Sequence, residues 1–173
     1  INKKMTNIDT KEILKFEIIT NQSRMKRLLL VWKDKLQKIG ITLSIKILDS
    51  SQFQNRIQSF NFNAIIFEYY MSLSPGNEQS IYWGSWAANQ QGSRNYAGIK
   101  HPAIDEVIKK ISNAKNRSEL IEYTKTLDRL IRAGHWIIPL YHDPLHRIAY
   151  KSGLQIPDEI PLYGFNPWTT WKK

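Results

Sequence analysis

The first seventy residues alternate between two hydrophobic patterns. Residues 15–20 and 41–48 have the pattern of strands, and residues 62–69 form a third, mostly apolar strand. Between them, apolar side chains recur at helical spacing over residues 25–39 and 53–60. This strand-helix-strand-helix-strand order, with short connections, predicts a parallel sheet with right-handed crossovers.

Capping residues support both helices. Asn21 or Ser23 is expected to cap the first helix, and Gly40 stands where a left-handed C-terminal residue belongs. Ser50 or Ser51 is the expected cap of the second helix.

The pattern changes after residue 70. Residues 71–100 have no clear period and are rich in Gly, Asn, Gln and Ser, which is typical of a long functional loop. Helices follow from Pro102 and over residues 118–133, the second with a capping box of Asn116 and Glu119. Two further strands, at 136–141 and 145–150, and a loop-like tail at 157–173 complete the prediction.

The net charge of +10, from 25 Lys+Arg against 15 Asp+Glu, leaves a basic nucleic-acid-binding module open as an alternative. Residues 51–100 nevertheless hold only three basic and two acidic residues, together with ten of the twenty aromatic ones. The positive charge is therefore spread along helices that also carry acids, which favours ordinary solvated helix faces.

Little in the sequence suggests a membrane span or catalysis. There is no Cys, and no apolar run approaches the roughly 20 residues that span a bilayer. His142 and His146 are four residues apart, but Pro139 and Pro144 disfavour a helix there, so no metal site is predicted. Neither a Gly-x-Ser-x-Gly elbow nor a phosphate-binding glycine loop occurs. We therefore predict no enzyme activity and no cofactor.

Several short motifs follow one another in the second half of the chain. They are Ser72-Leu73-Ser74-Pro75-Gly76-Asn77-Glu78-Gln79, Tyr82-Trp83-Gly84-Ser85, Gly92-Ser93-Arg94-Asn95-Tyr96-Ala97-Gly98-Ile99, the Pro102 helix with Asp105, and Ile138-Pro139-Leu140-Tyr141-His142. In this order they resemble the C-terminal portion of the dipeptide/oligopeptide class (family 5) of ABC-importer solute-binding proteins. Within that class, the chain is most similar to the Yej-type oligopeptide and microcin C binders, from about Lys15 to its end.

The resemblance implies an α/β fold, as the C-terminal fragment of a two-lobed periplasmic-binding-protein (type II) fold. Residues 1–70 would be a βαβαβ segment of the second lobe, and residues 71–173 would return to and complete the first lobe. The implied function is the capture of oligopeptides in an interlobe cleft and their delivery to an ABC permease in the inner membrane. The implied partners are an oligopeptide, that permease and the missing N-terminal part of the same protein, without nucleic acid. The implied location is the periplasm, although the chain opens on Ile1 without a signal peptide.

The candidate ligand-binding residues lie between residues 69 and 95. They are Tyr69, Tyr70, Ser72, Ser74, Asn77, Glu78, Trp83, Arg94 and Asn95. Aromatic walls with Asn, Gln and Ser suit pockets that accept varied side chains. The first of these residues also follow a parallel strand's carboxyl end, where ligand clefts of α/β sheets form.

Each aromatic or basic candidate has a structural alternative. Tyr69 and Tyr70 would instead be hinge and core packing. Trp83 and Trp86 would each be either part of a pocket wall or part of the core. Arg94 would pair through its planar fork either with a ligand carboxylate or in a structural ion pair.

The sequence departs from the family in its acidic residues. Several peptide binders of the wider family hold the ligand's amino terminus with an aspartate shortly after this strand, but no Asp occurs between Asp49 and Asp105. Glu78 is the nearest carboxylate after the predicted strand. It would either replace that aspartate or be a solvated loop residue.

Overall fold

The computed structural model describes residues 4–70, 72–145, 147–150 and 164. The chain divides into two compact units, Ile1–Ile137 and Ile138–Lys173. Within the described residues, all helices and strands lie in the first unit. They are β1 (Lys15–Thr20), η1 (Ser23–Met25), α1 (Lys26–Lys38), β2 (Thr42–Ile47), α2 (Ser50–Gln58), β3 (Ala64–Ile65), α3 (Glu78–Trp83), η2 (Ser85–Asn89), α4 (Pro102–Ser112) and α5 (Arg117–Ala133).

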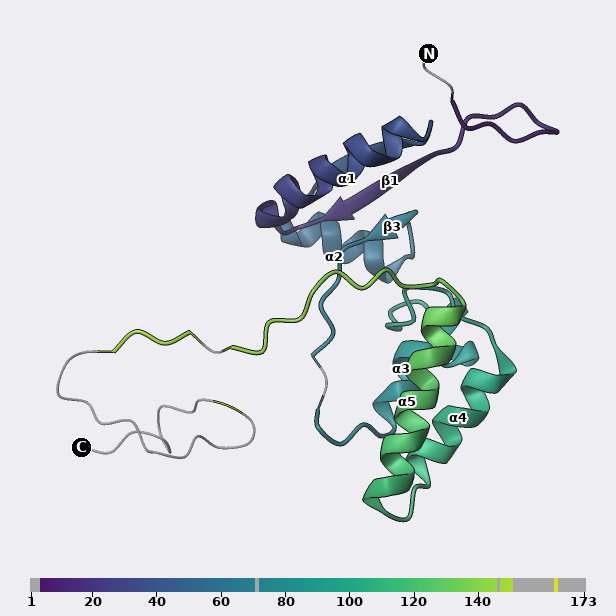
Figure 1. Cartoon of the computed structure of the whole chain (residues 1–173), viewed down its shortest axis with the longest axis vertical. Coiled ribbons are helices and arrows are strands. Elements are labelled where there is room, and N and C mark those ends of the chain that lie inside the picture. The colour runs from purple at the N-terminus through teal and green to yellow at the C-terminus, as the bar shows by residue number, and fades with distance from the viewer. Residues whose placement is uncertain (1–3, 71, 146, 151–163, 165–173) are drawn as a thin grey trace. The chain divides into compact units, whose positions relative to one another are not determined.

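The three strands form a parallel sheet in the order β2-β1-β3, as the sequence predicts. Successive residues of β1 point to opposite faces of this sheet. Ile18 packs with Leu29 of α1, whereas Ile19 packs with Phe53 and Ile57 of α2. The two helices therefore cover opposite faces, and Figure 1 shows them on either side of β1.

The N-cap of helix α2 lies one residue before the first of its predicted caps. Asp49 is the N-cap, and its Oδ1 accepts a hydrogen bond from the backbone N–H of Gln52 at 2.8 Å. The prediction of Ser50 or Ser51 was wrong because both residues already lie in the first helical turn. A carboxylate in the cap position also interacts favourably with the positive end of the helix dipole.

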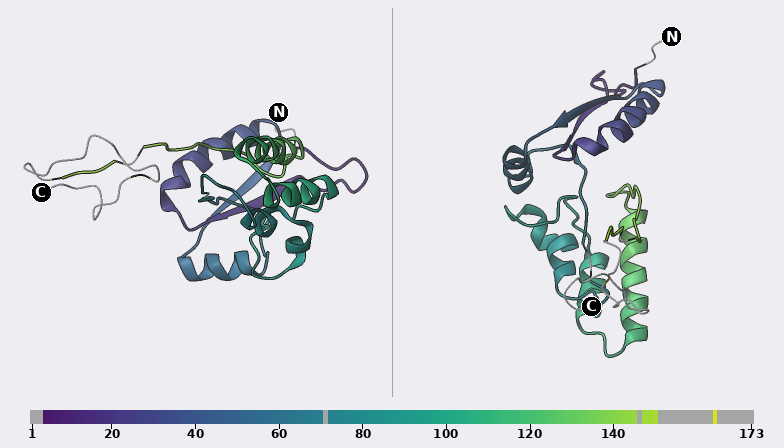
Figure 2. Two further views of the ribbon diagram at one scale, coloured as in Figure 1. Left: turned by 90° about the horizontal axis from the view of Figure 1, so that it is seen from below. Right: turned by 90° about the vertical axis from the view of Figure 1, so that its left-hand side faces the viewer.

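Helices α4 and α5 pack side by side (Figures 1 and 2) and form a third hydrophobic cluster of the first unit, besides the two on the faces of the sheet. Ile104 and Ile108 of α4 lie against Leu127 and Ile131 of α5 in this core. Asn116 caps α5 as predicted, because its side chain accepts a hydrogen bond from the N–H of Glu119 at 3.0 Å. The return bond of the predicted capping box is shifted by one residue, since the Glu119 carboxylate accepts from the N–H of Lys115 at 3.0 Å.

Residues 71–100 contain two helical segments, α3 and η2, where the sequence predicts a loop. The sequence shows no helical pattern here because α3 has only six residues, too few for a helical period. Tertiary contacts hold it instead, since Tyr82 and Trp83 are buried in the core with α4 and α5.

Asn95 ties this region together. Its side chain is fully buried, and its Nδ2 donates hydrogen bonds to the carbonyls of Gly84 (3.0 Å) and Ile99 (2.9 Å). Its Oδ1 accepts a third bond from the N–H of Ile99 at 2.9 Å. One amide therefore satisfies three backbone groups that the fold removes from water.

Three predicted strands are shortened or absent. β3 covers only Ala64–Ile65 rather than residues 62–69, and neither 136–141 nor 145–150 contains a strand among the described residues. A strand needs a neighbouring strand to bond its N–H and C=O groups. No described strand pairs with these segments, and Ile138 is accordingly 65% exposed. Apart from Gly164, the predicted tail at 157–173 lies outside the described residues.

We predict that Asn95→Ala lowers the free energy of unfolding by about 2–4 kcal/mol, because buried backbone groups lose their partner. Urea denaturation of the chain measures the change. Asn89→Ala, at an exposed residue of η2, is the matched control and should change stability by less than about 0.5 kcal/mol. Equal stabilities of the two variants would contradict the role of Asn95.

Glu17 of β1 gives a pH-dependent prediction. Its carboxylate contacts Arg56 at 2.7 Å and Lys46 at 3.4 Å. The hydrogen bond from Arg56 lowers the pKa of Glu17 below its ordinary 4.5, and outweighs the opposing effect of burial. A lowered pKa in the folded state means that the stabilisation is full above pH 4.5 and is lost as the pH falls.

Glu17→Gln should therefore cost about 0.5–1 kcal/mol at neutral pH, because the pair is partly exposed, and progressively less below about pH 4. Thermal melts of wild type and variant across this range measure the difference. Glu106→Gln, at an exposed carboxylate of α4, is the matched control for the loss of one carboxylate. If the stability difference between Glu17→Gln and wild type is the same at every pH, the ion pairs of Glu17 are not the cause of that difference.

Candidate ligand-binding site

The sheet has a topological switch point between β1 and β3. The chain passes from β1 to β2 on one side and then crosses back to β3 on the other. In open parallel α/β sheets, ligands bind outside the carboxyl ends of the strands at such a point. Here those ends are Thr20 and Ile65, and the side chains that follow them are the first candidates for a site.

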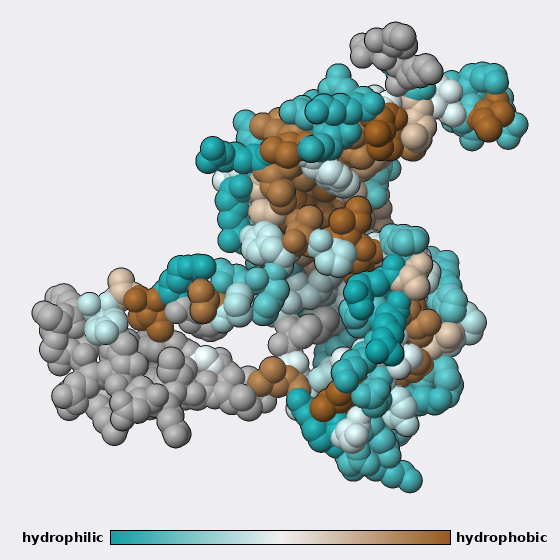
Figure 3. Space-filling view, in the orientation of Figure 1, coloured by the Kyte–Doolittle hydropathy of each residue, from teal (hydrophilic) through white to brown (hydrophobic). Residues whose placement is uncertain are grey.

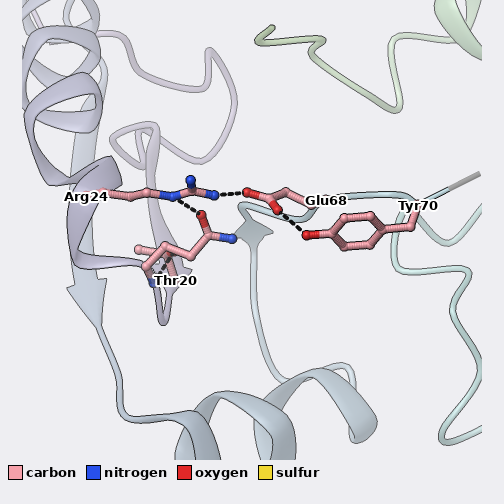
Figure 4. Close-up of polar contacts among 5 residues, drawn as sticks. Thr20, Arg24, Glu68 and Tyr70 are labelled. Carbon is pink, nitrogen blue, oxygen red and sulfur yellow. Dashed lines mark hydrogen bonds and ion pairs between the residues drawn. The ribbon is translucent and has the colours of Figure 1, made fainter. Parts of the chain in front are cut away.

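A row of polar side chains crosses this switch point (Figure 4). The N–H of Gln22 donates to Thr20 Oγ1 at 3.0 Å, and Gln22 Oε1 accepts from Arg24 Nε at 3.1 Å. The guanidinium of Arg24 also pairs with Glu68, which follows β3. The Tyr70 hydroxyl donates to the second carboxylate oxygen of Glu68 at 2.7 Å. The row thus leads from a buried strand end to an exposed phenol.

The central ion pair is open to solvent, with side-chain exposures of 63% for Arg24 and 37% for Glu68. Exposed pairs of this kind contribute at most about 1 kcal/mol to stability. The guanidinium carries five N–H donors and uses Nε and one Nη here, so donors remain for a second acceptor. The pair is thus better placed to bind a charged ligand than to stabilise the fold.

Tyr70 is 84% exposed, yet its hydroxyl is held by Glu68. This hydrogen bond and the negative charge of Glu68 raise the pKa of Tyr70, while the charge of Arg24 opposes them. The phenol therefore stays protonated at neutral pH and presents its ring to solvent.

An aromatic cluster lies beside this row. The ring centroid of Tyr69 is 5.4 Å from that of Tyr82, 4.9 Å from that of Trp83 and 4.9 Å from that of Phe67. Phe67 in turn lies 4.8 Å from Tyr96. Burial raises the pKa of Tyr69 well above its ordinary value, with smaller contributions from the neighbouring tyrosines. Tyr69 thus packs the chain immediately after β3.

The predicted site residues differ in accessibility. Ser72, Ser74, Asn77 and Arg94 are exposed, like Tyr70. Tyr69 and Glu78 are half-buried, and Trp83 and Asn95 are buried. Tyr69 and Trp83 are in ring contact, whereas Tyr70 is the predicted residue that takes part in the polar row at the switch point.

Glu78 folds over the start of α3. Its Oε1 accepts hydrogen bonds from the N–H of Gly76 at 3.0 Å and from Gln79 Nε2 at 3.2 Å. Burial alone would raise the pKa of Glu78, but these bonds and one from its own backbone outweigh it, and the pKa is lowered. The carboxylate is therefore ionised and held mainly by backbone groups.

Arg94 contacts Tyr82. Its Nη1 donates to the Tyr82 hydroxyl at 3.1 Å, and the guanidinium carbon lies 5.9 Å from the Tyr82 ring centroid. No carboxylate within the described residues pairs with Arg94. Its side chain thus carries an uncompensated positive charge next to the aromatic cluster.

Sequence reasoning missed Arg24 and Glu68. Glu68 was hidden because the third strand was predicted to run through Tyr69, which placed this carboxylate inside the strand. With β3 ending at Ile65, Glu68 rather than Glu78 is the first carboxylate after it. Arg24 lies in η1, directly after β1, and the switch-point rule applied to both strand ends would have found the two residues together.

Two further findings bear on the chemistry. Among the described residues, no three His, Asp or Glu side chains gather as a metal site would require. His142 is described, but His146, four residues further along the chain, lies outside the described residues. No helix in the described ranges is long and apolar enough to cross a membrane.

The strand order defines the class as an α/β protein with a parallel sheet, and the exposed charged row at its switch point is the candidate ligand site. No protein-family model matches the chain. A protein of Agrobacterium fabrum named "Probable peptide-binding protein YejA" is 39% identical over 168 residues, which are 97% of this chain and 27% of that protein. Another A. fabrum protein, named peptidoglycan-binding protein YepA, is 36% identical over 170 residues, or 98% of this chain and 28% of that protein.

A solved structure shares the fold. The mannohexaose-bound periplasmic oligopeptide-binding protein of an oligopeptide ABC transporter from Thermotoga maritima matches with a TM-score of 0.66 and 16% identity, over 82% of this chain and 29% of that one. The chain is homologous to the C-terminal portion of solute-binding proteins of the dipeptide/oligopeptide class. The predicted resemblance and the predicted α/β periplasmic-binding-protein fold are therefore confirmed. The chain spans little more than a quarter of the length of the two relatives, so most of each has no counterpart here.

We predict that Glu68→Gln lowers the pKa of the Tyr70 phenol towards its ordinary 10.0, because the acceptor loses its charge. Arg24→Ala should shift the pKa of Tyr70 in the opposite direction, since Arg24 lowers it in the wild type. NMR titration of ring-labelled tyrosine, assigned with Tyr70→Phe, measures both shifts. Glu78→Gln is the control, and an unchanged Tyr70 titration in Glu68→Gln would show that the hydrogen bond does not persist in solution.

Proposed function

We propose that this chain is the C-terminal part of an extracytoplasmic solute-binding protein that captures oligopeptides in a cleft between two lobes and delivers them to an ABC permease. The observation that carries the proposal is the 39% identity, over nearly the whole chain, to a protein named as peptide-binding. The exposed charged row at the switch point supplies the chemistry that such a ligand needs.

Within this proposal, Glu68 receives the ligand's amino terminus. An ammonium group can replace the Arg24 guanidinium as the partner of one carboxylate oxygen, while Tyr70 keeps the other. Arg24 is then released to bond a ligand carbonyl or carboxylate. This assignment provides a carboxylate after β3 although the chain has no Asp between Asp49 and Asp105.

The predicted residues after Tyr70 form the next part of the proposed site. Ser72, Ser74 and Asn77 are exposed and carry small polar groups that suit backbone and water-mediated contacts with varied peptides. Arg94 offers a free cation beside the aromatic cluster. Glu78, Tyr69, Trp83 and Asn95 would contribute by positioning this segment, because their polar groups or rings are engaged within the chain.

The two-lobed arrangement assigns residues 1–70 to the second lobe and residues 71–173 to the first. The change from sheet to helical core near residue 70 is the support for this boundary, whereas the compact units divide at Ile137, which keeps helices α3, α4 and α5 in one unit with the sheet. The partners in this arrangement are the N-terminal part of the same binding protein, an inner-membrane permease and the peptide. The location is the periplasm, where the binding protein of T. maritima is placed by its name.

The other functional classes have less support. The relatives and the solved structure named above are binding proteins, so an enzyme is disfavoured. Nothing in the fold or in these relatives supports the nucleic-acid-binding alternative that the charge of +10 raised.

The test is to co-express the chain with the N-terminal portion of the A. fabrum peptide-binding relative and to measure thermal stability with peptides. We expect a stable pair whose melting temperature rises with a peptide mixture, since a ligand that binds only the folded state stabilises it. Because the named relatives differ between peptide and peptidoglycan, the mixture should include one arm of murein-derived peptides. A pair that forms but responds to neither arm would refute peptide binding.

Glu68→Gln should weaken the binding of peptides with a free amino terminus by about ten- to a hundredfold, the usual value of a charge-assisted hydrogen bond. Amino-acetylated peptides should bind wild type and variant equally. Glu106→Gln is the matched control and should leave both peptide types unaffected. If Glu68→Gln binds peptides with a free amino terminus as tightly as wild type does, Glu68 is not part of the site.

A further inference from the structure

An apolar groove of about 490 Å³ runs along α5, and we name it the α5 groove. Its walls include Leu73, Pro75, Trp83, Leu120, Ile121 and Leu127. Trp83 and Leu127 belong to the buried core, whereas Leu73 is 46% exposed and Ile121 is 39% exposed. Figure 3 shows hydrophobic side chains interrupting the polar surface of this helical part of the first unit.

The α5 groove is long and already formed. Its residues on α5 extend from Arg117 to Ile131, a rise of about 21 Å along the helix. The opposite wall is held in place because Arg117 Nη1 donates to the carbonyl of Leu73 at 2.8 Å. A groove of this length fits the side of a helix or strand from another protein segment.

The polar groups along the α5 groove are engaged within the chain. Lys125 pairs with Glu122 at 3.2 Å, and Asp128 pairs with Arg132 at 2.7 Å. The Trp83 indole donates to Gln79 at 3.0 Å. Small-ligand sites add to an apolar lining a few convergent polar groups that fix orientation. The two charged pairs are more than half exposed and can form a polar rim, whereas Leu73, Leu120 and Ile121 line the α5 groove itself, which favours a mainly apolar protein surface as its occupant.

We propose that the α5 groove is the docking surface for an apolar helix or strand face of the N-terminal portion of the binding protein. This inference rests on the proposed function. The relatives extend well beyond the matched region, because the chain covers only 27% and 28% of them, and this additional length is sufficient to supply such a face. A second copy of this chain is disfavoured by its charge of +10, which makes two copies repel.

Ile121→Lys tests the proposal in the co-expressed pair. The side chain is partly exposed in the chain alone, so the variant should fold with an unchanged thermal melt. In the pair, the lysine would be buried without a partner, and association should weaken by about tenfold or more. Thr126→Lys is the matched control, because it adds the same charge to an exposed position about 140° around the same helix.

Co-purification and the dissociation constant of the pair, measured without peptide, give the result. Loss of association in Ile121→Lys but not in Thr126→Lys supports the proposal. Equal association of both variants, failure of the wild-type pair to form, or a dimer of the chain alone that Ile121→Lys abolishes would each overturn it. A pair that assembles through the α5 groove but binds no peptide would instead refute the proposed function and leave the docking surface intact.

Discussion

The packing of Tyr69 against Tyr82 and Trp83 is the contact on which the rest of the site depends. In an extended segment, alternate side chains point in opposite directions. Once Phe67 and Tyr69 lie in the aromatic cluster, Glu68 and Tyr70 must fall on the other side. That side is where Arg24 reaches them. A one-residue shift here would bury the carboxylate and expose the rings.

This alternation of side chains places residues in different clusters because β3 ends early. β3 pairs with β1 at Ala64 and Ile65, and the N–H of Ile66 still donates to the carbonyl of Ile19 at 3.3 Å. The residues from Phe67 onward leave the sheet and can contact both the cluster beside α2 and the core of α4 and α5. Phe67 reaches Tyr96, which packs with the α2 side of the sheet, and Tyr69 reaches the core of α4 and α5. The aromatic residues therefore connect the two cores where a longer strand would have kept them apart.

The sequence predicts the parts of the fold whose pattern repeats. Helices α1, α4 and α5 each bury one stripe, so the sequence shows their helical period. Strands β1 and β2 are short runs bounded by polar residues, and β1 is buried on both faces at Ile18 and Ile19. α3 is too short for a period and forms because Trp83 finds a core to enter. The apolar segments after residue 136 have strand patterns, yet pairing depends on a neighbouring strand, which no local pattern reveals.

The same limit explains what was missed in the site. Tyr70 could be predicted because aromatic residues stand out in sequence, whereas Arg24 is one of many basic residues and becomes distinctive only when β1 and β3 are neighbours. Asn95 shows the converse case. It is polar and lies in a motif-rich loop, but full burial and three backbone bonds commit its amide to the fold.

Burial and remaining hydrogen-bonding capacity thus separate two kinds of polar residue in this chain. A buried amide such as that of Asn95 stabilises the loop because every one of its bonds replaces water. An exposed pair such as Arg24 and Glu68 adds little stability and keeps donors and acceptors that a ligand can use. In the proposed function, a peptide's amino terminus replaces Arg24 as one partner of Glu68 at small energetic cost, because the pair that it disrupts is already solvated. The switch point supplies the position, and the weakness of its own ion pair makes that position available to a ligand.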